Sequence, residues 1–305
     1  MIKIGTRGSR LALWQAEFVA ETLQKGGFST EIVIIETKGD LVLDRALSKI
    51  GSKGVFTEEL EEKLRNGEID IAQHSAKDLQ SELADDLEII ALTERERVND
   101  VLVSFDKSLS LESGKPFVVG TSSTRRVAML KHFYPHINTV DMRGNLVTRL
   151  QKLERGACDA LLLAYAGVHR MGYLEHIAEL INIEKFTPAV GQGSVAIECT
   201  KNLDADKKAK IRALLNHATT ENCIIAERAF LRKLQGGCSI PVFGLCKISG
   251  EELSITGGLI SLDGKEILKE TLTGTNPEAL GLALAEKILE CGGDRILKEI
   301  KEQLY

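Results

Sequence analysis

Gly5-Thr6-Arg7-Gly8-Ser9 stands between an apolar run and a helical pattern, and it decides the fold together with a second stretch that resembles it. That second stretch is Gly120-Thr121-Ser122-Ser123-Thr124, which also lies between an apolar run and a helical pattern. Gly67-x-x-Asp70 and Gly156-x-x-Asp159 then follow in the same order, each between a helix and a strand. This repeated order predicts two related α/β domains that face each other across a cleft.

Strand and helix signals alternate along the first two thirds of the chain. Apolar runs predict strands at 2–4, 31–36, 69–72, 87–92, 117–120, 137–140, 159–164 and 194–199. Periodic apolar positions and end signals predict helices at 11–19, 56–66, 125–133, 145–153 and 205–216. The first helix is expected to bury a face formed by Leu11, Trp14, Phe18 and Val19. Strands that alternate with helices imply mostly parallel sheets, which bind ligands beyond their carboxyl ends.

Two short segments are predicted to cross between the halves, one near 94–97 and the other at Pro188-Ala189-Val190-Gly191-Gln192-Gly193. The strand at 194–199 would then rejoin the first domain. The predicted boundaries are 1–95 with 193–215 for domain 1, 98–189 for domain 2 and 217–305 for domain 3.

The third domain is predicted to be small and α+β, with a three-stranded sheet. Thr219 and Thr220 are expected to cap its first helix. Strands follow at 242–248, 253–260 and 266–272, and Pro277 begins a helix expected to end at Gly292-Gly293 before a last helix.

Composition excludes several classes of protein. The chain has 305 residues, 43% of them hydrophobic, and a net charge of −5, so it is predicted to be globular and not a general nucleic-acid binder. The sequence contains no run of about 18 apolar residues, so no membrane span is predicted. The N-terminus resembles a strand rather than a signal peptide. A cytoplasmic protein is expected. The six cysteines are scattered, and Pro135 interrupts the His132–His136 pair, so neither a disulfide framework nor a metal site is predicted.

Basic and hydroxyl side chains gather at the ends of the predicted elements. Arg7 and Ser9 precede one helix, and Ser123, Arg125 and Arg126 open its counterpart. Helix N-termini and forked arginine donors bind carboxylate or phosphate, whereas any one such arginine could equally be a solvated surface group. Further cations at element ends are Lys49, Lys53, Arg95, Arg143, Arg149 and Arg170. Nucleotide phosphate is a poor candidate ligand because the P-loop pattern is absent.

A lone acid follows a predicted strand in His74-Ser75-Ala76-Lys77-Asp78. Taken alone, Asp78 could simply cap a helix. Lys77 beside it favours the ionised form, and an ionised carboxylate in a cleft can stabilise a cation and move protons. His74 is predicted to be a packed or hydrogen-bonded histidine.

Gly236-Gly237-Cys238 places a thiol just after a helix expected to end at Leu234 or Gln235. The thiol could be a small buried apolar group, a nucleophile or a permanent anchor. A hydrolase is unattractive because the C-terminal third offers only His217 as a base. A tethered thiol, a lone acid and many cations together indicate chemistry on a polyanionic organic substrate.

The chain resembles the porphobilinogen deaminase family over nearly its whole length. The resemblance is carried by Thr6-Arg7-Gly8-Ser9 with Leu11-Ala12-Leu13-Trp14-Gln15-Ala16, Lys53-Gly54-Val55-Phe56, His74-Ser75-Ala76-Lys77-Asp78, Gly120-Thr121-Ser122-Ser123-Thr124-Arg125-Arg126, Arg143-Gly144-Asn145-x-x-Thr148-Arg149-Leu150, Pro188-Ala189-Val190-Gly191-Gln192-Gly193, and Ala226-Glu227-Arg228 up to Gly236-Gly237-Cys238.

This resemblance implies two type II periplasmic-binding-protein-like domains, a third domain, and a dipyrromethane cofactor joined to Cys238 through a thioether. Four porphobilinogens would be deaminated and added head to tail, and hydroxymethylbilane released. Asp78 matches the catalytic aspartate. Cofactor-binding positions are matched by Ser75, Lys77, Asp78, Ser123, Arg125, Arg126 and Arg143. Substrate-binding positions are matched by Arg7, Ser9, Lys49, Lys53, Arg95, Arg149, Arg170 and Gln192. The only small-molecule partner expected is porphobilinogen, and a monomer is expected.

The physical interpretation is consistent with this resemblance, since each added pyrrole brings two carboxylates and loss of ammonia creates an electron-poor carbon. The chain departs from the family pattern at Gln80, Glu58, Asn99 and Phe243, which bears on local loop shape and turnover. Two alternatives stay open at this point: a solute-binding protein for a small polyanion, which needs neither Asp78 nor Cys238, and a cysteine amidase, which needs a readily alkylated thiol.

Overall fold

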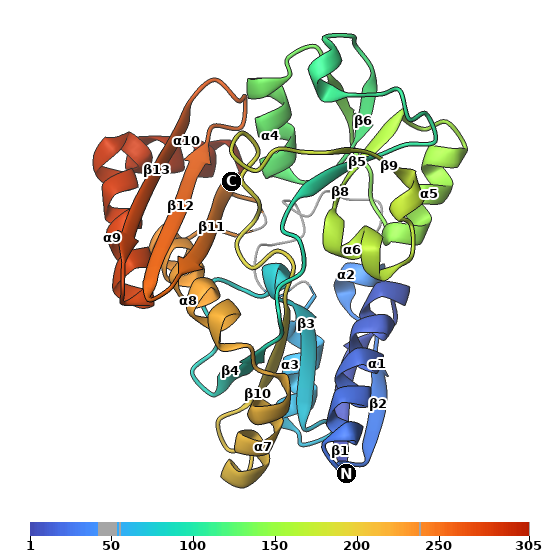
Figure 1. Ribbon diagram of the computed structural model, residues 1–305, viewed down its shortest axis with the longest axis vertical. Coiled ribbons are helices and arrows are strands. Elements are labelled where there is room, and N and C mark those ends of the chain that lie inside the picture. Colours follow the sequence, from blue (N-terminus) through green and yellow to red (C-terminus); the bar gives the residue numbers. More distant parts are fainter. Residues whose placement is uncertain (42–53, 55, 238, 305) are drawn as a thin grey trace.

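The computed structural model describes residues 1–41, 54, 56–237 and 239–304. The predicted site residues Lys49, Lys53 and Cys238 therefore lie outside the described residues. Figure 1 shows two α/β lobes and a separate three-stranded sheet with its own helices. No helix in the described ranges is long and apolar enough to cross a membrane.

The first lobe is a five-stranded sheet with the order β2-β1-β3-β10-β4. Its strands are β1 (Ile2–Arg7), β2 (Thr30–Ile35), β3 (Ile71–Ser75), β4 (Leu87–Leu92) and β10 (Val195–Thr200). Its helices are α1 (Arg10–Lys25), α2 (Lys38–Leu41), α3 (Glu58–Arg65) and α7 (Ala205–Leu215), and a 3-10 turn, η2 (Ala76–Asp78), follows β3. Each predicted strand and helix of this lobe is confirmed, with ends that shift by a few residues.

The second lobe repeats this arrangement with the order β7-β6-β8-β5-β9. Its strands are β5 (Asp100–Val103), β6 (Val118–Gly120), β7 (Asn138–Val140), β8 (Ala160–Ala164) and β9 (Ile177–Leu180). Its helices are α4 (Thr124–Phe133), α5 (Leu146–Glu154) and α6 (Tyr165–Arg170), with 3-10 turns η3 (Leu111–Ser113) and η4 (Leu174–His176). The strands β5 and β9 and the helix α6 were not predicted from the sequence.

In each five-stranded sheet, the fourth strand of the order given above runs antiparallel to its neighbours. In the chain, this strand directly follows a segment that crosses between the lobes. In the first lobe this strand is β10, which pairs antiparallel with β3 and β4. In the second lobe it is β5, which pairs antiparallel with β8 and β9. The prediction of two related domains joined by two crossings is therefore confirmed in its topology.

The two repeated Gly-x-x-Asp motifs make the same contacts in both lobes. Asp70 accepts a hydrogen bond from Lys3 N at 2.7 Å, and its own N donates to Lys3 O at 2.9 Å. Asp159 does the same with Val118, at 2.7 and 2.9 Å. Each aspartate thus ties the start of one strand to its neighbour, which explains why the spacing recurs.

The predicted buried face of α1 was right for Val19 but wrong for Trp14 and Phe18. The helix buries Ala12, Gln15, Ala16, Val19, Ala20 and Leu23. Trp14 and Phe18 are instead 36% and 40% exposed, and their rings stack with centroids 5.9 Å apart. Small alanines allow α1 to approach the sheet closely, which turns the bulky aromatic rings to the other side.

The third domain contains α8 (Ala218–Lys233), the sheet β11-β12-β13, and then α9 (Pro277–Ile288) and α10 (Asp294–Leu304). The strands are β11 (Val242–Ser249), β12 (Glu252–Ile260) and β13 (Ile267–Gly274). The three-stranded sheet was predicted correctly. Its residues Phe243 and Ile260 are fully buried in the core of the second lobe, so this domain packs directly against that lobe.

Two predicted helix ends in the third domain were wrong. The cap of α8 is His217, whose Nδ1 lies 3.4 Å from Thr220 N, so Thr219 and Thr220 belong to the first turn instead. Helix α9 ends at Ile288, and a π-helical turn at Leu289–Gly293 leads into α10, where Gly292 has a φ of 101°. An imidazole nitrogen can accept an N–H bond as a hydroxyl does, which the capping preference for threonine overlooked.

Candidate active site

The turn after β3 carries Asp78. Ser75 ends the strand, and its Oγ accepts a hydrogen bond from Gln15 Nε2 at 3.0 Å. Ala76 N donates to Ser194 O at 3.0 Å, which attaches the turn to the returning crossover. Asp78 ends η2 and is half-buried. Gln15 was quoted in a family motif but given no role, and its burial on α1 beside Ser75 makes it part of this site.

The returning crossover passes very close to this turn. Gly191 has a φ of 74°, and a Cβ there would stand 3.0 Å from the carbonyl carbon of Ala76. Gln192 donates from Nε2 to Val98 O at 2.7 Å and to Asp100 Oδ1 at 3.1 Å. Its Oε1 accepts a long hydrogen bond of 3.5 Å from Lys77 Nζ. Gln192 therefore links the Asp78 turn of the first lobe to the first strand of the second.

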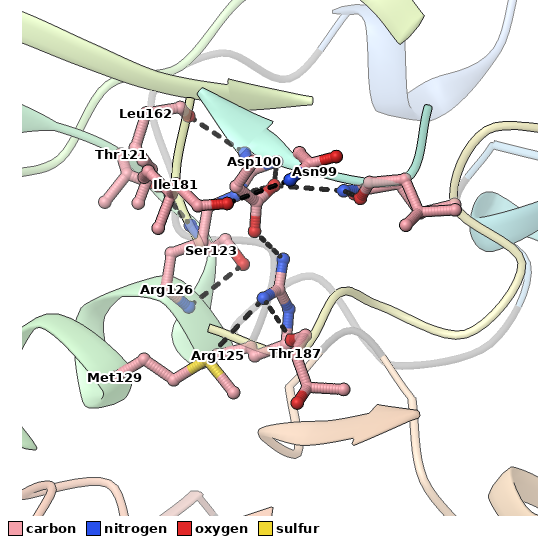
Figure 2. Close-up of polar contacts among 12 residues, drawn as sticks. Asn99, Asp100, Thr121, Ser123, Arg125, Arg126, Met129, Leu162, Ile181 and Thr187 are labelled. Carbon is pink, nitrogen blue, oxygen red and sulfur yellow. Dashed lines mark hydrogen bonds and ion pairs between the residues drawn. The ribbon is translucent and has the colours of Figure 1, made fainter. Parts of the chain in front are cut away.

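Two arginines at the start of α4 converge on Asp100 at the start of β5 (Figure 2). Arg125 Nη2 donates to Asp100 Oδ2 at 2.6 Å, and Arg126 Nη2 donates to Oδ1 at 2.6 Å. Arg125 also donates to Thr187 O and to Met129 Sδ, while Arg126 also donates from Nε to Asp100 Oδ1 and from Nη1 to Leu162 O. All three side chains are buried. The arginine pair was predicted as an anion site, whereas the acid that organises it was not.

Asp100 is held ionised by these arginines. Burial alone would raise the pKa of its carboxyl group, but the charges of Arg125 and Arg126 lower it far below the ordinary value. Asn99, one of the departures from the family pattern, donates from Nδ2 to Ile181 O at 2.9 Å and so fastens the same strand start (Figure 2).

Two more predicted cations lie near this cluster. Arg149 on α5 donates from Nε to Gly144 O at 2.7 Å. Burial, and then the charge of Arg126, lower the pKa of Arg149 to about 10, while the charge of Asp78 opposes this shift. Arg149 therefore lies within electrostatic reach of both Arg126 and Asp78, across the two lobes. Arg143, just before Gly144, is also buried.

The serines of the two matched loops play parallel roles, because each caps the helix that follows its loop. Ser9 caps α1 by accepting from Ala12 N at 3.3 Å, and Ser123 caps α4 by accepting from Arg126 N at 3.5 Å. The guanidinium of Arg7 lies over the ring of Phe56 at 4.2 Å. These contacts place both loops at the helix N-termini where the repeated motif predicted them.

Arg170 and Arg95 lie where the lobes join. Arg170 Nη2 donates to Gly193 O at 2.7 Å, and its guanidinium is 5.5 Å from the ring centroid of Trp14. Arg95 forms two bonds with the carboxylate of Glu227, at 2.6 and 3.0 Å, and a third with Gln192 O at 2.8 Å.

Glu227 is the second buried acid that sequence reasoning did not assign a role. It is fully buried, and besides Arg95 it accepts from Gly191 N and Cys246 N, both at 2.8 Å. The carboxylate of Glu227 thus bonds both crossing segments, through Arg95 and Gly191, and also β11, through Cys246. A glutamate inside a helical apolar pattern was the available signal, because a buried acid requires a partner.

Two departures from the family pattern meet beside the described residue Gly54. Gln80 donates from Nε2 to Glu61 Oε1 at 3.1 Å, and a Cβ on Gly54 would lie 3.0 Å from that same nitrogen. Glu58 forms an exposed ion pair of 3.0 Å with Lys38. Both residues therefore make contacts of their own in this chain.

The arrangement suits a ligand with several carboxylates. A half-buried acid on the first lobe is linked, through Lys77 and Gln192, to the buried pair of arginines that Asp100 holds in the second lobe, and each lobe has a serine-capped helix N-terminus. Such a donor set binds carboxylates and leaves one carboxylate to stabilise positive charge.

Comparisons with known proteins follow the same division of the chain. Residues 2–209 match the model of the porphobilinogen deaminase dipyromethane cofactor binding domain, and residues 221–290 match that of the porphobilinogen deaminase C-terminal domain.

Curated relatives cover the chain almost completely. A porphobilinogen deaminase from Cytophaga hutchinsonii is 56% identical over 99% of this chain and 98% of its own length. One from Desulfosudis oleivorans is 51% identical over 99% of this chain and 98% of its own length.

Solved structures that are similar to the chain include the methionine binding protein MetQ, at 16% identity and a TM-score of 0.43, covering 70% of this chain and 89% of that one. Another is the second substrate binding domain of a putative amino acid ABC transporter from Streptococcus pneumoniae, at 14% identity and a TM-score of 0.43, covering 70% and 91%.

Proposed function

The chain belongs to the porphobilinogen deaminase family of transferases, and from this premise we propose which of its residues carry the polymerisation of porphobilinogen. This membership decides against the solute-binding and amidase alternatives. The observation that supports the residue assignment best is that Gln192 bonds both Lys77, the neighbour of Asp78, and Asp100, the acid that pairs with Arg125 and Arg126. One side chain therefore links the turn that carries Asp78 to the arginine pair of the second lobe.

The dipyrromethane cofactor of the family is held, in our proposal, by a thioether to Cys238 and by polar groups from both lobes. These groups are Ser75, Lys77, Asp78, Ser123, Arg125, Arg126 and Arg143. Arg125 and Arg126 fit this role only through donors left over from Asp100, since each already bonds that acid. When bound, the cofactor supplies the pyrrole carbon on which the first unit is added.

Asp78 is the proposed catalytic residue. In each cycle the C–N bond of porphobilinogen breaks and the electron pair leaves with the nitrogen, which departs as ammonia. A C–C bond then forms between the freed carbon and the terminal pyrrole carbon, which loses its proton. Positive charge develops on the pyrroles at both stages, and a carboxylate at hydrogen-bond distance from their N–H groups stabilises it. Asp78 can also accept the proton that is lost.

The substrate carboxylates are bound, we propose, by Arg7, Ser9, Lys49, Lys53, Arg149, Arg170 and Gln192. Arg95 was assigned to the same group, and its three bonds to Glu227 and Gln192 favour a role in fixing the crossover next to these ligands. The domain boundaries, a cytoplasmic location and a monomeric state remain predictions of the same proposal.

Cys238→Ser is expected to abolish turnover of porphobilinogen, because a serine hydroxyl is far less nucleophilic than a thiolate and cannot form the thioether. Loss of activity should reach the detection limit in an assay of ammonia release. Cys291→Ser, at the exposed cysteine of the third domain, is the matched control and should keep wild-type turnover. Wild-type turnover in Cys238→Ser would remove the anchor from the proposal.

The charge of Lys77, one of the proposed cofactor-binding groups, predicts a pH dependence of turnover. Burial, and then the charge of Arg126, lower the pKa of Lys77 from 10.5 to about 8. A neutral amine cannot pair with a carboxylate and so positions the cofactor less well, and kcat/KM should therefore fall several-fold between about pH 7 and pH 9. Lys77→Arg keeps its charge and should flatten this fall. A kcat/KM of wild-type protein that is constant over this range would contradict the assignment.

The lowered pKa of Lys77 has the opposite effect on stability, because it raises the free energy of unfolding as the pH rises. Because the folded pKa of Lys77 is about 8 and the ordinary value is 10.5, the unfolded chain holds the proton more tightly. The contribution of Lys77 to the free energy of unfolding therefore rises between these two pH values. A lower kcat/KM at alkaline pH cannot then be ascribed to a loss of stability caused by Lys77.

A further inference from the structure

Arg228 is a half-buried arginine on α8 that the proposed function does not use. Its Nη2 donates to Gln80 O at 2.8 Å and to Ser81 O at 3.4 Å. Those two carbonyls belong to the second and third residues after Asp78. The bonds therefore run from the third domain to the main chain that leaves the Asp78 turn.

Apolar packing from the same helix reaches the other side of this turn. Ile224 lies four positions before Arg228 and is fully buried in a cluster with Ala76 and Leu79. Residues four apart share one face of a helix. Helix α8 thus contacts the turn at two points, one apolar and one polar, on either side of Asp78.

Moving the charged group of Arg228 away from water costs free energy, which argues against its contact with the Asp78 turn being incidental. Burial lowers the pKa of Arg228 to about 10, and the charge of Glu198 opposes that shift. Glu198 is fully buried, bonds His74 Nε2 at 3.1 Å through Oε2, and leaves Oε1 without a hydrogen-bond partner among the described residues. The predicted hydrogen-bonded role of His74 is confirmed. The guanidinium group of Arg228 is oriented by the two main-chain carbonyls.

Helix α8 also leads to the proposed cofactor anchor. It ends at Lys233, five positions before Cys238, and Phe230 fixes it in the core of the third domain. Helix α8 therefore contacts the turn that carries Asp78 and leads, along the chain, to the segment that carries Cys238.

We infer that Arg228 is a positioning residue, which holds the Asp78 turn at a fixed distance from the cofactor-bearing third domain. The inference rests on the proposed function, because it takes Asp78 as the catalytic residue and Cys238 as the anchor. Arg228 touches neither substrate nor cofactor in this account. It acts through the main chain of Gln80 and Ser81, so its loss should affect the reaction step more than substrate binding.

The test compares Arg228→Gln and Arg228→Lys with Arg232→Gln. Arg232 lies one turn further along the same helix, is 43% exposed and pairs with Glu278 on α9, which makes it a matched control. The measurements are kcat and KM for porphobilinogen, the melting temperature, and the intact mass of each purified protein.

In Arg228→Gln, kcat should fall roughly 10- to 100-fold, since small misplacements of a reacting group cost rates of this order. KM should stay within about 2-fold. Arg228→Lys keeps one donor and should recover part of kcat, while Arg232→Gln should match wild type. If Arg228→Gln fails to fold, the kcat of Arg228→Lys decides.

Two results would overturn the inference: a kcat in both Arg228 variants equal to that of Arg232→Gln, or loss of the cofactor mass, which would assign Arg228 to cofactor attachment instead. Asp78→Asn, run alongside, separates the two hypotheses. If Asp78→Asn stays active, the proposed function fails, whereas a dead Asp78→Asn with an unaffected Arg228→Gln contradicts the positioning role alone.

Discussion

Asp78→Asn should lower the turnover of porphobilinogen by roughly 10²- to 10³-fold, the usual cost of removing one group that stabilises transition-state charge. Asparagine has almost the same shape, so the turn held by Ser194 and Gly191 should persist. It has no negative charge and cannot accept a proton, so both functions assigned to Asp78 are lost together. The measurement is kcat from steady-state ammonia release.

The control for this variant is Asp86→Asn, in the same lobe. Asp86 is exposed and pairs with Arg65 at 2.7 Å, and exposed pairs of this kind contribute little. Its turnover should equal wild type. A kcat within a few-fold of wild type in Asp78→Asn, with the cofactor mass retained, would take Asp78 out of the catalytic role.

Asp100→Asn is expected to cost about 3 to 5 kcal/mol of stability, the typical result of breaking a buried ion pair from one side. Both oxygens of Asp100 accept from arginine, at 2.6 Å each, and all three side chains are buried. The variant leaves two guanidinium groups without their counter-charge. Urea unfolding followed by circular dichroism would measure the loss.

The carboxylate of Asp100 also predicts that the protein loses stability at low pH. Because the pKa of Asp100 is depressed far below its ordinary value of 3.8, its contribution to stability is complete above about pH 4 and is lost as the pH falls further. Asp100→Asn should lack this part of the pH dependence. Glu184→Gln, which removes an exposed partner of Lys247 at 3.7 Å, is the control and should stay within about 0.5 kcal/mol of wild type. A similarly small loss in Asp100→Asn would contradict the structural role given to the cluster.

Much of the fold could be predicted because each lobe repeats the same local signals. The two Gly-x-x-Asp motifs tie equivalent strand starts, so their spacing reports a real structural unit. The missed strands β5 and β9 are each only four residues long. β5 also begins with a charged residue, Asp100, whose burial depends on arginines that the chain brings from α4. A local apolar pattern cannot reveal such a strand.

The error on α1 has a different physical cause. Periodicity was judged by the largest apolar side chains, which favoured Trp14 and Phe18. The helix instead packs through alanines, because close approach to a sheet favours small side chains, and its large rings stack on each other beside Arg170. Periodicity identified the helix correctly but not the face that it buries.

The sequence predicted the basic residues of the candidate site but not the acidic residues that bond them. Arg125 and Arg126 were recognised as adjacent cations at a helix start, yet Asp100 lies 25 positions before Arg125 and reaches it only through the sheet. Glu227 and Arg95 are 132 positions apart and meet for the same reason. Sequence patterns identify the groups that bind a polyanion, whereas the acids that hold those groups in place depend on tertiary structure.

The intact mass of the purified protein tests the central claim most directly. Protein made in cells that synthesise porphobilinogen should exceed the 33.4 kDa mass of the chain by two linked pyrroles, and Cys238→Ser made in the same cells should not. An unmodified mass in wild-type protein that still produces the linear tetrapyrrole would contradict the account.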